Sequence, residues 1–220
     1  NSEMADAIIF VKDHFQSFER FKELAQSGYP PKRGQAGNNG GSDIIFFDSR
    51  SDLYNQFKDR NIIFAASMRN ARSDSFDIGS GDSIFLDIAD NSEDIVDAII
   101  DAYQALPDRG GRQQRRRKTK QEWKKILYQE SKRKLPANSV LIPRAIRATG
   151  RVYLSRNPIF VSTNFVVCSL PSLDKAIILS TWMSTIFYQL ICEVSSKDQE
   201  GMRKMEVSDI AKTYIPVLDN

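Results

Sequence analysis

The fold of this chain is decided by the stretch NPIFVSTNFVVCSLPSLDKAIILSTWMSTIFYQL, residues 157–190. Its first half is rich in β-branched and aromatic side chains, which predicts a strand over residues 159–169. Pro171 and Ser172 mark the start of a helix, and most of the residues after them are apolar or small. This pattern predicts one long, buried helix that begins after Ser172 and runs to Val194. A strand that leads into a buried helix favours the α+β fold class.

The chain has 220 residues, enough for one large domain or two small ones with a real core. Its hydrophobic fraction of 41% and charged fraction of 27% are those of an ordinary globular protein rather than a disordered one. Cys168 and Cys192 lie in apolar surroundings, which predicts buried thiols in a reducing compartment, with a single bridge between them as the alternative. Residues 176–194 contain several polar side chains, so we expect a buried helix there and not a membrane span.

The N-terminus has no uninterrupted apolar stretch of the kind found in signal peptides, so we expect a cytoplasmic location. The chain starts at Asn1 without an initiator Met, from which we expect a fragment of a longer protein. Such a fragment need not contain the catalytic residues of its parent.

Two regions are predicted from the order of the patterns along the chain. Residues 1–135 form an N-terminal α+β region, and residues 136–220 contain the strand and the long helix. The first region includes a Gly-rich loop (28–42), an acidic segment (73–108) and a basic insertion (109–135). Helices are predicted over residues 5–25, 52–57, 93–105 and 120–133. Strands are predicted over residues 43–47, 62–68, 83–88, 140–142 and 152–154.

Charge is strongly segregated along the chain, although the net charge is only +3. Residues 73–108 contain ten Asp and Glu and no Lys or Arg, whereas residues 109–156 contain sixteen Lys and Arg and two acids. A solvated helix face rarely needs a surplus of +14, so the basic stretch predicts a polyanionic partner. The alternative is a solvated linker that only shields the acidic segment before it.

We predict that the partner is a nucleic acid, because arginine binds phosphates and, in bidentate geometry, guanine. The sequence RGGRQQRRRKTKQEWKK, residues 109–125, is suited to several phosphate contacts at once, and a second basic series continues to Arg156. The predicted DNA-binding residues are Arg112, Arg115, Arg116, Arg117, Lys118, Lys120, Lys124, Arg144, Arg147, Arg151, Arg203 and Lys204.

A second function class is suggested by a match to the Pro-Asp…Glu-x-Lys pattern of Mg²⁺-dependent nucleases. The match consists of Pro107-Asp108 and Glu122-Trp123-Lys124, in which the carboxylates would bind Mg²⁺ and the lysine would position water. That chemistry requires Glu122 and Lys124 on a strand, whereas their surroundings predict a basic helix. We therefore favour a chance match and keep a nuclease domain as an alternative. A third alternative is a protein-interaction scaffold in which the acidic and basic segments neutralise each other.

No catalytic residue, metal site or cofactor site is expected within the chain itself. The sequence DIGSGDSIFL, residues 77–86, is similar to a loop that cradles S-adenosylmethionine, but it follows polar residues instead of an apolar strand. We interpret it as a turn between strands. The single histidine, His14, has no cysteine cluster with which to bind zinc, and a catalytic triad would rest on it alone.

The C-terminal part of the sequence resembles a family of proteins that act on DNA. Residues 157–190 are followed by SSKDQEGMRKMEVSDIAKTYIPVL, residues 195–218. Together they resemble the end of a target recognition domain in N6-adenine DNA methyltransferases. Relatives with this domain include the fused type IIG restriction-modification enzymes and, more distantly, type I specificity subunits. The matching positions are Gly201, Arg203, Lys204, Ser208, Asp209, Ile215 and Pro216.

The resemblance implies a sequence-specific DNA-binding module of a bacterial, cytoplasmic restriction-modification enzyme. It places the catalytic methyltransferase region in the same parent chain, with S-adenosylmethionine and, if the parent also cleaves DNA, Mg²⁺. The chain itself is then expected to bind duplex DNA and to catalyse nothing. In the closing segment we expect a flexible cationic loop at residues 201–204 and one helical turn capped by Ser208. Pro216 is expected to keep residues 215–218 out of a central strand.

Overall fold

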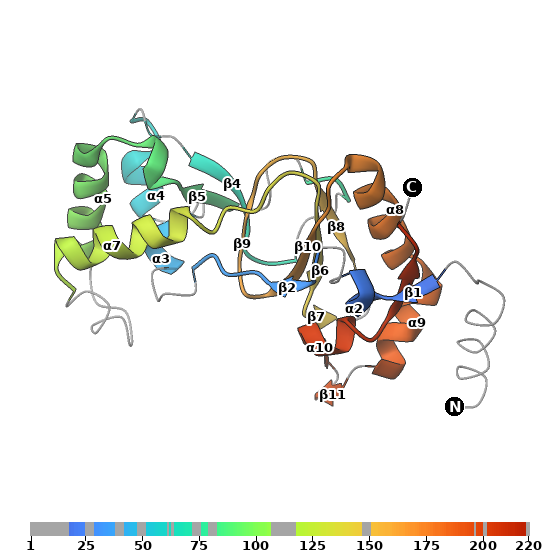
Figure 1. Ribbon diagram of the computed structural model, residues 1–220. Helices are drawn as coiled ribbons and strands as arrows, with labels where there is room; N and C mark the ends of the chain where they lie inside the picture. Colours follow the sequence, from blue (N-terminus) through green and yellow to red (C-terminus); the bar gives the residue numbers. More distant parts are fainter. Residues whose placement is uncertain are drawn as a thin grey trace.

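The chain folds into two lobes that lie side by side (Figure 1). We call them the α5 lobe, on the left of Figure 1, and the α8 lobe, on the right, after helices α5 (Glu93–Ala105) and α8 (Leu173–Met183). Each lobe contains a four-stranded sheet and the helices that pack on it. The computed structural model describes residues 18–24, 29–37, 42–47, 52–60, 62, 64–71, 76–78, 83–106, 118–146, 151–195, 197–199 and 202–218.

The sheet of the α5 lobe combines strands from both ends of the sequence. Its order is β3 (Phe46–Phe47), β5 (Ser83–Leu86), β4 (Phe64–Met68) and β9 (Phe160–Val161), and only the β4–β9 pair is parallel. The rings of Phe85 and Phe160 stack with their centroids 3.7 Å apart, across β4. The lobe also contains the short helices α3 (Ser42–Ile45) and α4 (Asp52–Phe57). Because β9 is the edge strand of the sheet, the C-terminal half of the chain contributes to this lobe.

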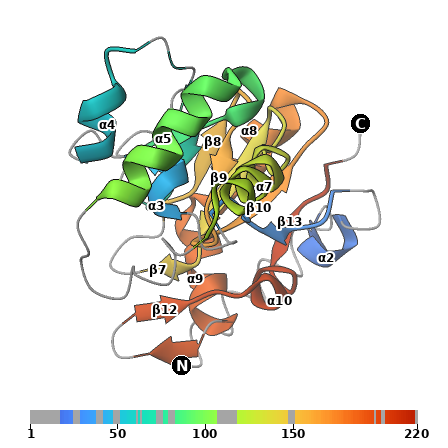
Figure 2. The ribbon, with the colours of Figure 1, turned by 90° about the vertical axis from the view of Figure 1, so that its left-hand side faces the viewer.

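Helices α5 and α7 (Lys120–Ser131) lie beside each other on the outside of this lobe, as the end-on view in Figure 2 shows. Helix α5 was predicted from the Ser92 cap and the acids in its first turn, and α7 from apolar residues at helical spacing. At their contact, the rings of Tyr103 and Trp123 meet edge to face with centroids 5.3 Å apart, and both side chains are buried. Thr119 caps α7 and forms a reciprocal capping box with Glu122, which fixes the start of the helix.

The sheet of the α8 lobe is antiparallel throughout. Its order is β2 (Lys32–Arg33), β10 (Phe165–Ser169), β6 (Ser139–Pro143) and β8 (Tyr153–Ser155). The register of β6 and β10 pairs Phe165 with Pro143 at one end and Ser169 with Ser139 at the other. All five residues of β6 are buried, which is the pattern expected for a strand covered on both faces.

The two faces of this sheet belong to two different clusters of buried side chains. Val140 and Val166 face helix α8 and its cluster, whereas Leu141 and Val167 face the other way. The second cluster also includes Met68 of β4, so it joins the sheets of the two lobes into one continuous interior. Successive side chains of a strand point to opposite faces of the sheet. Because both faces are covered, every residue of β6 is buried.

The prediction of one continuous helix after Ser172 is wrong, because the segment forms two helices. Helix α8 ends at Met183, and α9 (Ile186–Ser195) follows at an angle of 67°. Ser184 and Thr185 lie at the break, and their hydroxyls donate hydrogen bonds to the carbonyls of Ser180 (2.8 Å) and Trp182 (2.7 Å). Side chains that bond to the backbone in this way compete with the helical pattern and favour a break.

In the described ranges, no single helix is both long and apolar enough to cross a membrane. Residues Leu173–Met183 and Ile186–Val194 reach that length and composition only when they are taken together, across the bend. Buried side chains of both helices, among them Leu179 and Tyr188, pack in the core of the α8 lobe.

The closing segment contains three short strands and one helical turn. Strands β11 (Lys197–Gln199) and β12 (Met202–Lys204) form a sheet with β7 (Ala145–Ile146), so Arg203 and Lys204 lie on a strand and not in the expected loop. The helical turn is α10 (Val207–Ile210), and its N-cap is Glu206 instead of Ser208. Strand β13 (Tyr214–Pro216) pairs only with β1 (Phe18–Arg20) among the described strands, as expected for a strand that contains proline.

Other predictions of local structure are wrong in part. The predicted strand 159–169 is two strands, β9 and β10, separated by a turn. The predicted helix 5–25 falls mostly outside the described residues, and its end forms β1 followed by the short helix α2 (Phe21–Leu24). The predicted strand 43–47 is helix α3 followed by β3. The predicted loop 28–42 contains strand β2, which pairs with β10. The division of the chain at residue 135 stays a prediction, and strands β1 and β2 from its first region pair with β13 and β10 of its second.

Candidate nucleic-acid interface

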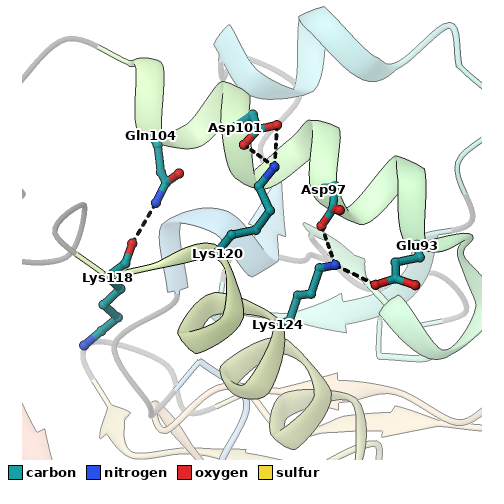
Figure 3. Close-up of polar contacts among 7 residues, drawn as sticks. All are labelled: Glu93, Asp97, Asp101, Gln104, Lys118, Lys120 and Lys124. Carbon is teal, nitrogen blue, oxygen red and sulfur yellow. Dashed lines mark hydrogen bonds and ion pairs between the residues drawn. The ribbon is translucent and has the colours of Figure 1, made fainter.

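The acidic and basic segments meet along α5 and α7 in what we call the α5–α7 ion-pair row (Figure 3). Lys120 Nζ lies 2.7 Å from Asp101. Lys124 Nζ lies 2.7 Å from Glu93 and 2.8 Å from Asp97. The three acids recur every four residues on α5 and the two lysines every four residues on α7, so each set faces the other helix.

The ion-pair row changes the charge that this part of the chain presents to a partner. Hydrogen bonds to Asp97 and Glu93 raise the pKa of Lys124, so this lysine stays charged and engaged. Pairs of this kind are accessible to water and contribute little to stability, because solvent screens them. Lys120 and Lys124, both predicted to bind DNA, therefore have partners within the protein. Lys118 differs, because only its backbone carbonyl takes part, accepting from Gln104 Nε2 at 2.7 Å.

The nuclease-like pattern does not have the geometry that its chemistry requires. Glu122 and Lys124 lie on helix α7 and not on a strand. The Glu122 carboxylate accepts hydrogen bonds from the backbone N–H (2.7 Å) and hydroxyl (3.0 Å) of Thr119, and these bonds lower its pKa. Asp108 lies outside the described residues. Within the part of the chain that the structure describes, no group of three or more His, Cys, Asp or Glu side chains is placed to hold a metal ion.

A second cationic site lies in the α8 lobe, around Arg144. This residue follows β6 and is only 8% exposed. Its backbone N–H donates to the carbonyl of Asn164 at 2.9 Å, and its own carbonyl accepts from the N–H of Met205 at 2.8 Å. Its guanidinium donates to the carbonyl of Thr163 at 3.0 Å and to the carboxylate of Glu206. We call these five residues the Arg144 junction.

The carboxylate of Glu206 is surrounded by cations. Burial alone would raise its pKa, but the hydrogen bond and charge of Arg144, with the charges of Lys204 and Arg33, lower the pKa overall. Lys204 Nζ lies 3.6 Å from this carboxylate, and Arg33 Nε donates to the carbonyl of Thr163 at 3.3 Å. One acid therefore faces three bases, and a local excess of positive charge remains at the surface, where Arg33 is exposed.

The turn between β9 and β10 presents an amide beside these cations. Asn164 is exposed, and its Nδ2 donates to the carbonyl of Arg69 at 3.0 Å and to Asn70 Oδ1 at 3.3 Å. Ser162 Oγ donates to the same carbonyl of Arg69 at 2.7 Å. The Ser-Thr-Asn stretch, residues 162–164, is part of the family resemblance, but Asn164, Asn70 and Arg33 were missed as candidate site residues.

The structure divides the predicted DNA-binding residues between the two lobes. Lys118, Lys120 and Lys124 lie at the start of α7, at the far end of the α5 lobe, whereas Arg144 and Lys204 lie in the α8 lobe (Figure 1). Arg203 is in β12, paired with Ile146 and Asp198, and Arg151 is exposed just before β8. The predicted residues outside the described ranges are Arg112, Arg115, Arg116, Arg117 and Arg147.

Residues 32–220 match the family described as the specificity domain of restriction endonuclease BpuSI. The match covers most of the chain, so the chain belongs to this family of specificity domains, which are parts of restriction enzymes. A search of curated proteins found no match. The family predicted from the C-terminal residues is therefore confirmed, and the match extends through the region for which the sequence alone gave no family.

A solved structure with the same fold is that of the type IIG restriction endonuclease BpuSI. It is 28% identical to this chain, with a TM-score of 0.82. The similarity covers 98% of this chain and 26% of the BpuSI chain. This chain therefore spans about a quarter of the length of that enzyme, and the predicted α+β, target-recognition-like fold is confirmed.

Proposed function

We propose that this chain recognises a specific sequence in duplex DNA, as the target recognition module of a restriction-modification DNA methyltransferase. The observation that carries the proposal is the match of residues 32–220 to a specificity domain, together with a fold that follows the type IIG enzyme BpuSI over 98% of this chain. The α5–α7 ion-pair row supports the protein-scaffold alternative only in part, because it engages two of the sixteen Lys and Arg in residues 109–156.

The charges that support DNA binding are those left after internal pairing. Six cations of the basic stretch form ion pairs within the described part of the chain: Lys120, Lys124, Arg133, Lys134, Arg144 and Arg156. The sequence 109–117 adds five arginines within nine residues and no acid. Together with Arg33 of the α8 lobe, these arginines are suited to phosphate contacts, which supply affinity without reading the sequence.

The catalytic steps belong, in this proposal, to the rest of a longer parent chain. A methyltransferase that acts on adenine must take the base out of the helix and into a pocket, and it needs S-adenosylmethionine as methyl donor. We expect that pocket, the cofactor and any Mg²⁺ used for cleavage in the catalytic region of the parent. The role of this chain is to place that region on the correct sequence.

Salt-dependent binding tests the proposal. A labelled random duplex is titrated with the chain at 50 and 200 mM salt and followed by fluorescence anisotropy. If about six phosphates are contacted, the affinity should fall on the order of a thousandfold between the two conditions. A selection from a pool of randomised duplexes should then enrich one sequence, which serves as the cognate site. Absence of binding at low salt would favour a protein-interaction scaffold, and a flat salt titration would contradict contact with the DNA backbone.

A further inference from the structure

We infer that Asn164 reads a base in the target sequence and that Arg144 is a positioning residue that holds Asn164 in place. This inference rests on the proposed function, because it needs duplex DNA as the ligand. It also reassigns Arg144, which the sequence predicted to contact DNA directly. The turn Ser162–Asn164 would enter a groove of the duplex, with Arg33 and Lys204 beside it on the phosphates.

The first argument is that Arg144 is engaged internally. The residue is 8% exposed, and its guanidinium donates to both the Thr163 carbonyl and the Glu206 carboxylate. Its remaining nitrogen, Nε, is buried without a hydrogen-bond partner. A buried guanidinium with a carboxylate partner is poorly placed to meet a phosphate. The fork of an arginine, however, can hold two acceptors at a fixed separation, which a lysine cannot do.

The second argument is that the β9–β10 turn is fixed from both sides. On one side Arg144 holds the carbonyls of Thr163 and Asn164. On the other side Gly34 packs so closely that a Cβ at this position would lie 2.2 Å from the carbonyl oxygen of Ser162. A turn held in this way keeps its exposed side chain in one place, and base reading requires such fixed geometry.

The third argument is the direction of the Asn164 amide. Both hydrogens of its Nδ2 are used within the protein, by the Arg69 carbonyl and Asn70 Oδ1. Its Oδ1 accepts from no residue in the described ranges and is left as an acceptor on an exposed side chain. In the major groove, the exocyclic amino groups of adenine and cytosine are the donors that such an oxygen can bind. The chemistry therefore favours an adenine or a cytosine opposite Asn164.

The charges around the turn match this role. Arg33, exposed, donates to the Thr163 carbonyl of the turn, and Lys204, half-buried, lies near Glu206, which is paired with Arg144. A second acid, Asp209, accepts from the backbone N–H of Glu206 at 3.0 Å. An uncharged amide with cations nearby is the arrangement expected of a base-reading element, in which phosphate contacts set the register and one neutral side chain reads the base.

The test compares two affinities for each variant, one for the selected cognate duplex and one for a random duplex, and records the salt slope of both. Asn164→Ala should lose on the order of ten- to hundredfold on the cognate duplex and nothing on the random one. Arg144→Lys keeps the charge and loses the fork, so it should lower the cognate-to-random ratio by about tenfold with an unchanged salt slope. The triple variant Arg115→Ala, Arg116→Ala, Arg117→Ala is the control for phosphate contacts and should weaken both duplexes about equally.

The outcomes separate the inference from the proposed function. If the wild-type chain binds no duplex, or enriches no sequence, the proposed function fails and the inference fails with it. If the wild type prefers the cognate duplex and Asn164→Ala has the same ratio of cognate to random affinity, the inference alone is overturned. Should Arg144→Lys fail to fold in a thermal melt, Glu206→Gln takes its place. Glu206→Gln should bind the random duplex more tightly, because an acid is lost, and should still lower the ratio of the cognate to the random affinity. If this ratio is unchanged, Arg144 does not position Asn164.

Discussion

The buried carboxylate of Glu130 accepts a hydrogen bond of 2.7 Å from the backbone N–H of Gly37, 93 residues earlier in the chain. Arg133 Nη1 completes the contact by donating to Glu130 Oε1 at 2.8 Å and to the carbonyl of Gln35 at 2.6 Å. Glu130 belongs to α7 of the α5 lobe, whereas residues 35–37 continue from β2 of the α8 lobe. A single buried acid therefore ties the two lobes together at the end of α7.

Glu130→Ala should lower the free energy of unfolding by about 3 kcal/mol, because it leaves the Gly37 N–H without its acceptor and removes the carboxylate partner of Arg133. Glu130→Gln keeps an acceptor oxygen and should cost clearly less. Urea denaturation of the wild type and both variants measures the difference. A loss below about 1 kcal/mol for Glu130→Ala would show that this tie contributes little.

The triple variant Arg115→Ala, Arg116→Ala, Arg117→Ala should weaken cognate and random duplexes about equally. These arginines are expected to contact phosphate, whose charge is the same for every sequence, so the salt slope should fall by about 2 to 3 units. The matched control is Lys120→Gln with Lys124→Gln, whose charges are engaged by α5. The control should change the salt slope by less than the triple variant does. An equal change would show that Lys120 and Lys124 also contact DNA.

Arg203→Ala should cost about 1–3 kcal/mol on the cognate duplex and less on random DNA. The reason is that its backbone is fixed in β12 between Ile146 of β7 and Asp198 of β11, and a fixed backbone favours base reading. Competition binding with both duplexes measures the two losses. If they are equal, Arg203 is a phosphate contact.

Glu122→Gln should change neither DNA cleavage nor stability by a measurable amount. Glutamine replaces glutamate in a capping box, so helix α7 keeps its start. The control is Thr119→Ala, which removes the cap and should cost about 1 kcal/mol of stability. Mg²⁺-stimulated cleavage by the wild type that disappears in Glu122→Gln would restore the nuclease alternative.

Cys168 and Cys192 should not react with thiol reagents in the folded protein at pH 8.5, and both should react in denaturant. The two thiols are free, and burial raises the pKa of each to about 12. An unfolded thiol ionises near pH 8.5. Stability should therefore fall by about 1.4 kcal/mol per pH unit for each thiol above that pH, until the folded thiols ionise. Unfolding measured at pH 7.5 and 9.5 should show a smaller loss for Cys168→Ala than for the wild type.

Local patterns were enough to predict the parts of the fold in which neighbouring residues decide the structure. Helices α5 and α7 and strands β4, β6 and β10 follow from the spacing of apolar residues within each segment. The break between α8 and α9 was missed because it depends on whether Ser184 and Thr185 turn back to the backbone, which composition does not reveal. Strand β1 was missed because its partner, β13, is almost 200 residues away.

The candidate site shows a similar division. The excess of positive charge could be counted, and the family resemblance indicated DNA. The sequence could not show which cations have partners, because Lys124 meets acids about 30 residues away and Arg144 meets Glu206 at a separation of 62. The roles proposed for Asn164 and Arg144 depend on those long-range contacts and became visible only when the chain was folded.

The pairing of β1 with β13 places Phe18 opposite Pro216 as Cα partners. The first and last strands that the structure describes therefore lie side by side. Adjacent entry and exit points are what allow a folded unit to be inserted into another protein, or permuted, without stretching the chain on either side. A unit joined in this way can be exchanged for another of the same plan, and under the proposed function such an exchange would give the parent enzyme a new target sequence while the rest of its structure stays unchanged.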